Sequence, residues 1–187
     1  GDVDFEGKIA IKTLRRRSSR EKIQRFKKEI DVLKQIKGNF SNVIEIKEYE
    51  LEKPPYSYKM RRYEGDSNDL LDVTRDNVVK TAELMFPVVE TLKVLAEGNP
   101  AIYHRDLKPE NILYEGTKEE PILILADFGC AFLGIEGEER FTQEFRSVGA
   151  MAYRAPEYHY GRVDNVNEKG DIFSIGKLLW YFVNGVE

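Results

Sequence analysis

Residues 103–111 read YHRDLKPEN, and this stretch decides how the rest of the chain is interpreted. Asn111 follows Asp106 by five residues, so both side chains can belong to one short loop. His104 taken alone would more often be a hydrogen-bonded core histidine than a catalytic residue. A functional interpretation of residues 103–111 therefore depends on whether other segments of the chain belong to the same motif set.

Four further segments lie at fixed distances on either side of residues 103–111. Ala10-Ile11-Lys12 ends in a lysine within a strand-like stretch, and Glu29 follows that lysine 17 residues later. Asp127-Phe128-Gly129 and Ala155-Pro156-Glu157 come after the central stretch in the same order. In order and spacing, the chain resembles the eukaryotic-type serine/threonine protein kinase family.

The resemblance implies a role for each of four polar side chains in phosphoryl transfer. Asp106 would accept the proton of the attacking hydroxyl, and Lys108 would contact the γ-phosphate of ATP. Asn111 and Asp127 would hold Mg²⁺ through hard oxygen ligands, which this ion prefers. The implied reaction is ATP- and Mg²⁺-dependent transfer to Ser or Thr hydroxyls of protein substrates.

The resemblance also implies a nucleotide site between two lobes. Lys12 would bind the α- and β-phosphates and pair with Glu29, provided that the helix carrying Glu29 lies inward. Ala10 and Leu113 would sandwich the adenine, and Met60 would lie behind it. The hinge, residues 61–63, would bind the adenine through its backbone. The implied cofactor-binding positions are Lys12, Glu29, Ala10, Met60, Arg61, Tyr63 and Leu113.

Other positions match the scaffold of the family. Leu33, Ile46, His104 and Phe128 would form an internal hydrophobic column, with the histidine packed beneath Phe128. Asp171 would anchor the backbone of the catalytic loop, because a buried carboxylate needs hydrogen-bond donors.

The expected fold is α+β with two lobes, a small β-rich lobe over residues 1–64 and a mainly helical lobe over 65–187, each incomplete. Strands are predicted at 8–12, 43–50 and 56–63 from alternating and β-branched residues. A helix from Ser18, capped by a Ser18–Glu21 box, is predicted to end at Gly38.

The second half of the chain has a different pattern. Residues 65–68 read as a turn-like linker. Helical patterns cover residues 77–97, where Pro87 is expected to introduce a kink, and residues 168–183 before Gly185. Short strands are predicted at 112–114 and 122–125, and residues 129–149 as a polar loop.

Composition excludes several classes of protein. The chain has 187 residues, 41% of them hydrophobic and 33% charged, which is typical of a globular domain. Its single cysteine, Cys130, allows no intrachain disulfide and favours a reducing compartment such as the cytoplasm. No apolar run approaches the roughly 20 residues that span a bilayer.

Charge is distributed unevenly along the chain. The net charge of −4 argues against a general nucleic-acid binder. Residues 8–37 nevertheless carry 12 Lys and Arg against three acidic residues. This basic segment is either a solvated helix face or a docking surface for an acidic or phosphorylated partner.

Two alternatives to an active protein kinase stay open. A pseudokinase or scaffold would use the same fold for binding only, although Lys12, Asp106 and Asp127 are all present. A kinase of a small hydroxylated metabolite is a weaker alternative. The family's glycine-rich loop is not visible, and Ala150 stands where the family usually has threonine. Thr142 and Ser147 are the candidate acceptors for regulatory phosphorylation.

Overall fold

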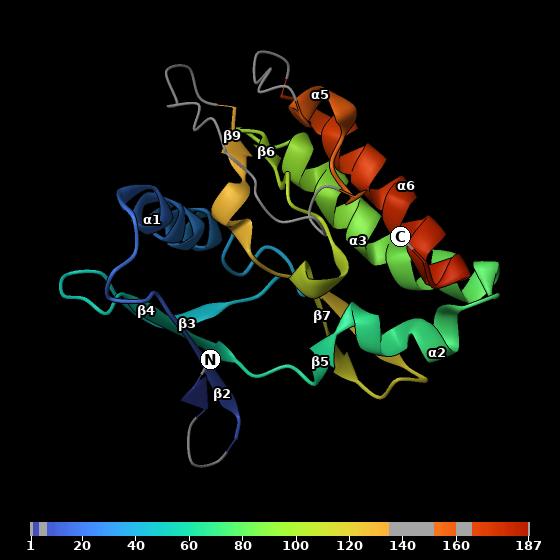
Figure 1. Ribbon diagram of the computed structural model, residues 1–187, viewed down its shortest axis with the longest axis horizontal. Helices are drawn as coiled ribbons and strands as arrows, with labels where there is room; N and C mark the ends of the chain where they lie inside the picture. Colours follow the sequence, from blue (N-terminus) through green and yellow to red (C-terminus); the bar gives the residue numbers. More distant parts are fainter. Residues whose placement is uncertain (1, 4–6, 135–151, 160–165, 187) are drawn as a thin grey trace.

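The computed structural model describes residues 2–3, 7–134, 152–159 and 166–186 (Figure 1). A four-stranded antiparallel sheet and one long helix form the first lobe, and paired helices with short strands form the second. The first sheet has the order β1-β2-β4-β3. Its strands are β1 (Asp2–Val3), β2 (Ile9–Thr13), β3 (Ile46–Glu50) and β4 (Ser57–Arg61). The α+β two-lobed fold expected from the sequence is confirmed.

Helix α1 (Arg20–Gln35) packs its apolar face inward. Phe26, Ile30 and Leu33 are buried at steps of four and three, which places them on one apolar stripe of the helix. The predicted cap is wrong by one residue. Ser19 is the N-cap and accepts the backbone N–H of Lys22, whereas the Ser18 hydroxyl donates to the Arg15 carbonyl.

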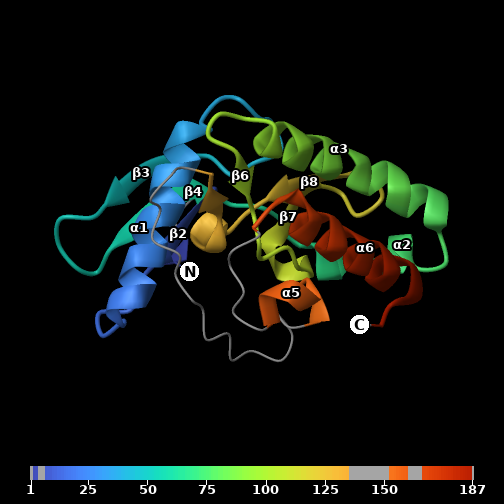
Figure 2. The same ribbon diagram turned by 90° about the horizontal axis from the view of Figure 1, so that it is seen from above.

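The second lobe is built on two helices that lie side by side, α3 (Val78–Ala96) and α6 (Glu168–Asn184) (Figure 2). Helix α3 continues through Pro87 as one element, so the proline does not divide it. Helix α6 ends at Gly185, whose φ of 71° is the left-handed conformation that glycine tolerates. Short helical segments accompany this pair, namely η1 (Ser67–Leu70), α2 (Leu71–Thr74) and α5 (Pro156–His159).

Two further small sheets follow the first lobe in the chain, and loops of the site join their strands. The predicted linker at 65–68 instead forms β5 (Gly65–Asp66) and the start of η1, because Gly65 pairs with Tyr114 across the sheet. The order of this sheet is β5-β7-β8, and β6 pairs with β9 separately. The remaining elements are β6 (Ile102–Tyr103), η2 (Pro109–Asn111), β7 (Ile112–Gly116), β8 (Pro121–Leu125), η3 (Phe128–Cys130) and β9 (Phe132–Leu133).

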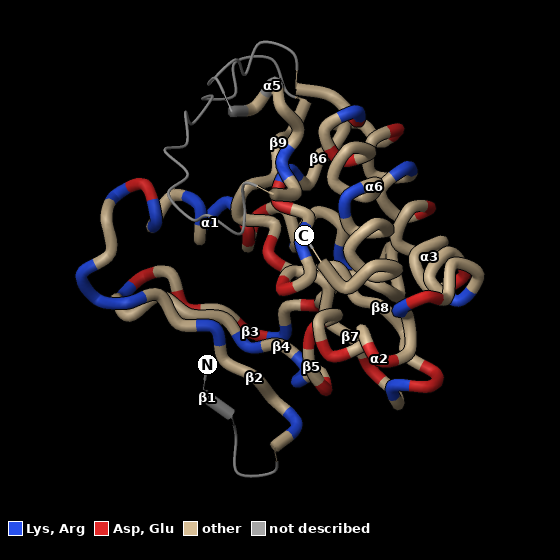
Figure 3. Tube along the Cα trace, turned by 45° about the vertical axis from the view of Figure 1, so that its right-hand side comes forward, with Lys and Arg blue, Asp and Glu red and all other residues tan. Residues whose placement is uncertain are grey.

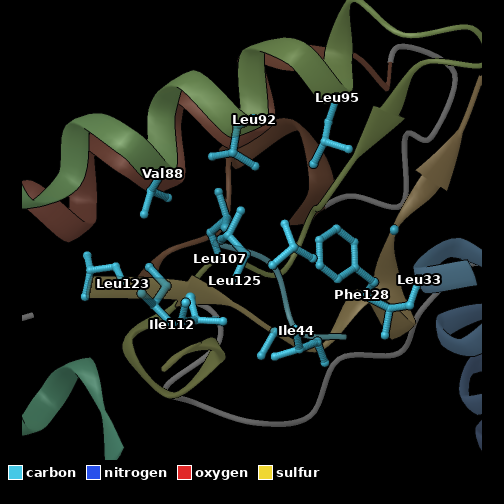
Figure 4. Close-up of a cluster of buried hydrophobic side chains, with 14 of the residues drawn as sticks. Leu33, Ile44, Val88, Leu92, Leu95, Leu107, Ile112, Leu123, Leu125 and Phe128 are labelled. Carbon is cyan, nitrogen blue, oxygen red and sulfur yellow. The ribbon is translucent and has the colours of Figure 1, made fainter. Parts of the chain in front are cut away.

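The hydrophobic core runs from one lobe into the other. Figure 4 shows Val88, Leu92 and Leu95 of α3 on one side of the cluster and Leu33 of α1 beside Phe128 at its end. Burial of this apolar surface, worth about 25 cal/mol per Å², helps to hold α1 against the loops of the second lobe. Within the described ranges, no helix combines the length and apolar character needed to cross a bilayer.

Candidate active site

The loop between β6 and η2 is held from below by a buried carboxylate. Asp171 of α6 accepts the backbone N–H of His104 at 2.7 Å and that of Arg105 at 2.8 Å. Arg105 has a φ of 65°, a left-handed conformation that is costly for a residue with a side chain. The two hydrogen bonds hold the loop in this conformation, as the Asp171 prediction required.

His104 is a structural residue in this loop. It is fully buried, and its ring centroid lies 4.7 Å from that of Phe128. Its Nε2 lies 3.0 Å from the carbonyl oxygen of Ala126. With Leu33 and Ile46 also buried, all four residues of the predicted column are buried, and Leu33, Ile46 and Phe128 belong to the hydrophobic core.

The loop also brings two polar side chains to Asp106. Asn111 donates its Nδ2 to the carbonyl oxygen of Asp106 at 2.7 Å and to its Oδ2 at 2.9 Å. Lys108 Nζ lies 3.5 Å from the same Oδ2. The Asn111 amide therefore fixes the orientation of the Asp106 carboxylate and keeps its own oxygen for another partner.

Lys12 of β2 and Glu29 of α1 form a two-pronged ion pair. The Lys12 Nζ lies 2.8 Å from each carboxylate oxygen of Glu29. It also lies 3.3 Å from Oδ1 of Asp127, which approaches from the second lobe. Helix α1 thus lies inward in this structure, and one ammonium group joins acids from two elements that are distant in sequence.

Burial and charge shift the pKa values of these groups. Burial and the nearby charge of Asp127 raise the pKa of Glu29 to about 7, against the opposing effects of Lys12 and Tyr58. Burial alone would lower the pKa of Lys12, but the charges of Glu29 and Asp127 outweigh it and raise that pKa. Burial opposes ionisation of Asp127 as well, yet the charge of Lys12 holds the pKa of Asp127 below its usual range.

Asp127 has an unusual backbone conformation, with φ 59° and ψ 68°. Its Oδ1 accepts the backbone N–H of Gly129 at 3.4 Å. The glycine fits closely, because a Cβ added there would meet Asp127 Oδ1 at 3.2 Å. Non-glycine residues in this region of φ and ψ cluster at functional sites, and here the conformation brings the carboxylate to Lys12.

These charged groups converge on one cavity of about 310 Å³ between α1 and the loop that joins β6 to η2. The charged side chains that line it are Lys12, Lys22, Arg25, Glu29, Asp106, Lys108 and Asp127. A larger cavity of about 520 Å³ lies between α3 and α6, but its lining is mostly apolar. The charged cavity therefore offers groups that can bind a polyanion such as a nucleotide phosphate chain, and the apolar cavity does not.

The predicted adenine-binding residues are only partly brought together. Ala10 and Met60 are cross-strand partners on β2 and β4, and Leu113 lies on β7 of the second lobe. Arg61 and Tyr63 contribute their side chains to a different cavity of about 270 Å³, where Arg61 pairs with Glu115. None of these five residues lines the cavity that holds Lys12, and their roles stay predictions.

One residue of the site was missed by the sequence reasoning. Tyr58 of β4 is 1% exposed, and its hydroxyl donates to Oε1 of Glu29 at 2.8 Å. The alternating pattern of its strand predicts that Tyr58 faces one side of the sheet. No local signal connects it to an acid 29 residues away.

The basic segment of residues 8–37 contributes side chains to one edge of the site. Figure 3 shows Lys and Arg concentrated along the connection from β2 into α1. Arg15, Arg16, Arg17 and Arg20 are exposed, and Lys22 belongs to the cavity lining. Thr142, Ser147 and Ala150 lie outside the described residues, as does the side chain of Glu157.

Comparison with known proteins extends these observations. The family described as "Protein kinase domain" matches residues 3–187. A probable serine/threonine-protein kinase of Dictyostelium discoideum is 32% identical over 92% of this chain and 9% of its own length. Stress-activated protein kinase alpha of the same organism is 28% identical over 96% of this chain and 27% of its own length.

A third relative covers only part of the chain. The serine/threonine-protein kinase mos of Patiria pectinifera is 42% identical over 42% of this chain and 22% of its own length. The chain thus spans less than a third of the length of each of these relatives.

Proposed function

This chain belongs to the protein kinase domain family, and we propose that its protein transfers the γ-phosphoryl group of ATP, with Mg²⁺, to Ser or Thr hydroxyls of protein substrates. One observation carries the proposal. Lys12, Asp106, Lys108 and Asp127 come from both lobes and line a single cavity. The family and the names of its serine/threonine members support this reaction over others.

Asp106 is the proposed acceptor of the hydroxyl proton. Its carboxylate is oriented by Asn111 and lies 3.5 Å from the positive charge of Lys108. Fixing a base in this way removes the need to order it during the reaction, and general-base catalysis contributes about 10²–10⁴-fold in rate. Lys108 would also neutralise charge on the transferred phosphoryl group.

The proposed Mg²⁺ ligands are the oxygens of Asn111 and Asp127. Within the described ranges, no three His, Cys, Asp or Glu side chains gather closely enough to hold a metal ion on their own. The two oxygens of Asn111 and Asp127 fit Mg²⁺, which is bound by one or two protein oxygens together with substrate phosphates. When bound, the ion would neutralise the charge that develops on the phosphate oxygens.

Lys12 is the proposed ligand of the α- and β-phosphates. Its side chain is 34% exposed and lines the cavity, while its ammonium group pairs with Glu29. In the family, a threonine usually stands at the position of Ala150 and bonds to the catalytic aspartate and lysine, and alanine has no hydroxyl for this role. We expect turnover to be slower for this reason.

The reaction is tested with the complete protein, radiolabelled ATP, Mg²⁺ and a generic protein substrate. Asp106→Asn should abolish incorporation of phosphate while ATP affinity changes little. Asp72→Asn is the matched control, because Asp72 is an exposed aspartate in α2 of the same lobe. Undiminished autophosphorylation of Asp106→Asn would contradict the role proposed for Asp106.

Other outcomes identify the alternatives. Thermal stabilisation by ATP and Mg²⁺ without any phosphate incorporation would identify a pseudokinase that binds nucleotide as a scaffold. Transfer to small alcohols and not to proteins would identify a metabolite kinase.

The basic segment of residues 8–37 is proposed to dock an acidic or phosphorylated protein segment. Its exposed arginines lie in sequence between Leu14 and Lys22, both of which line the cavity that holds Lys12. Replacing Arg15, Arg16 and Arg17 together by Glu should weaken binding of an acidic peptide, and 0.5 M salt should weaken wild-type binding similarly. If neither the triple substitution nor the added salt weakens binding of the acidic peptide, the proposal is contradicted.

A further inference from the structure

Tyr58 lies between the sheet and α1 at the centre of the first lobe. It is the cross-strand partner of Lys12 on β2, and its ring stacks on Phe26 of α1 with centroids 5.5 Å apart. The Lys12 ammonium lies 5.7 Å from the centroid of the Tyr58 ring. The tyrosine therefore contacts both members of the Lys12–Glu29 pair.

The Tyr58 hydroxyl supplies a donor that the buried carboxylate needs. Glu29 is 1% exposed, and its Oε1 accepts from both Lys12 Nζ and Tyr58 Oη at 2.8 Å. A buried hydrogen-bond acceptor that loses its donor is left unsatisfied, which costs free energy unless water replaces the donor. Burial and the charge of Glu29 raise the pKa of Tyr58 far above its usual value, so the hydroxyl stays protonated and remains a donor.

We propose that Tyr58 is a positioning residue, whose hydroxyl holds the Glu29 carboxylate and with it keeps α1 inward so that Lys12 is aimed at the nucleotide phosphates. The proposal rests on the function proposed above. The hydrogen bond joins β4 to α1 directly, whereas Lys12 joins β2 to α1. Two strands of one sheet thereby hold the same carboxylate.

The position of α1 and the aim of Lys12 are coupled through this contact. Without the hydroxyl, Glu29 keeps only the ammonium, which also attracts Asp127. The carboxylate is then free to leave with α1, and Lys12 can turn toward Asp127. Misdirection of a phosphate-binding group reduces the rate of the chemical step more than it reduces ground-state binding.

The chain offers a matched pair of tyrosines for the test. Tyr49 of β3 is the cross-strand partner of Tyr58, and its hydroxyl also reaches α1, where it accepts from Lys34 Nζ at 3.3 Å. Tyr49 is 49% exposed and lies outside the cavity lining. Tyr58→Phe and Tyr49→Phe each remove one hydroxyl and keep the ring, so packing is preserved in both variants.

Two readouts are measured on the complete protein, steady-state kinetics with ATP and hydrogen exchange of the α1 backbone amides relative to those of α3. Tyr58→Phe should lower kcat about fivefold or more, with a change of less than about twofold in the KM for ATP. Its α1 amides should exchange faster while the α3 amides stay unchanged. Tyr49→Phe should match the wild type in both readouts.

The outcomes separate this proposal from the proposed function. Wild-type exchange at α1 in Tyr58→Phe would overturn the positioning role, whatever its kcat. A wild-type protein that transfers no phosphate would contradict the proposed function alone, and exchange at α1 would still decide the positioning role. If Tyr58→Phe does not fold, Glu29→Ala removes the acceptor of the Tyr58 hydroxyl and should also show faster exchange at α1 than Tyr49→Phe.

Discussion

Asp171 Oδ2 accepts the backbone N–H of His104 at 2.7 Å, across 67 residues of sequence. Its second oxygen accepts the N–H of Arg105, so one buried carboxylate determines the conformation of two consecutive residues. The strained backbone of Arg105, one residue before Asp106, is held by this contact. Helix α6 therefore holds the loop between β6 and η2 through a single side chain.

Asp171→Asn is expected to destabilise the protein and reduce phosphate transfer. An amide offers one acceptor oxygen, and its NH₂ group would face the second backbone N–H. The free energy of unfolding should fall by about 1–3 kcal/mol, as measured by thermal unfolding. Asp31→Asn, at an exposed position of α1, serves as the control. Equal stability of the two variants would contradict the anchoring role.

Ser19→Ala is expected to destabilise α1 more than Ser18→Ala. Ser19 accepts the Lys22 N–H at 3.3 Å, which satisfies one of the first four amides of the helix. Its loss should cost about 0.5–2 kcal/mol in the free energy of unfolding, measured by urea titration. Ser18 only donates to the Arg15 carbonyl, so its replacement should cost less. The reverse order would show that the cap lies at Ser18.

Glu29→Gln is expected to gain stability relative to the wild type as pH rises. The folded protein holds the pKa of Glu29 at about 7, above its ordinary value of 4.5. Folding therefore favours the protonated carboxyl, and the wild type loses stability between pH 4.5 and about 7. Glutamine does not titrate.

Thermal unfolding at pH 5 and pH 8 measures this effect. The stability of Glu29→Gln minus that of the wild type should increase by about 1–3 kcal/mol between the two pH values. A difference that stays constant, or that falls with pH, would show that Glu29 keeps an ordinary pKa in the folded protein.

Asn111→Ala is expected to lower the transfer rate and to raise the Mg²⁺ concentration needed. The variant loses the two hydrogen bonds to Asp106 and one proposed metal oxygen. Loss of such oriented groups costs about 10–100-fold in metal affinity or activity. A Mg²⁺ titration at saturating ATP measures the shift, with the exposed Asn39→Ala as control. An unchanged Mg²⁺ requirement would remove Asn111 from the metal site.

Much of the fold could be predicted from the sequence because helices and strands are local. The apolar steps of α1 and the alternation in β2 and β4 follow from neighbouring residues alone, and so does the end of α6 at Gly185. Errors arose where a local pattern had two interpretations. Ser18 and Ser19 are adjacent candidate caps, and the linker at 65–68 contains a strand only because β7 lies beside it.

Within the site, the identity of the charged residues was available from the sequence, and their contacts were not. The order and spacing of the motifs identify Lys12, Glu29, Asp106, Asn111 and Asp127 as the charged and polar residues of the site. The hydroxyl of Tyr58 had no such signal, since its acceptor is 29 residues away on another element.

The sequence by itself determined the type of fold and the set of groups suited to phosphoryl transfer, because periodicity and motif spacing are properties of neighbouring residues. Only the tertiary structure decided that α1 lies inward, that Lys12 reaches both Glu29 and Asp127, and that Asp171 holds the catalytic loop. These contacts join elements distant in sequence, and they form because burial of the shared core brings those elements together.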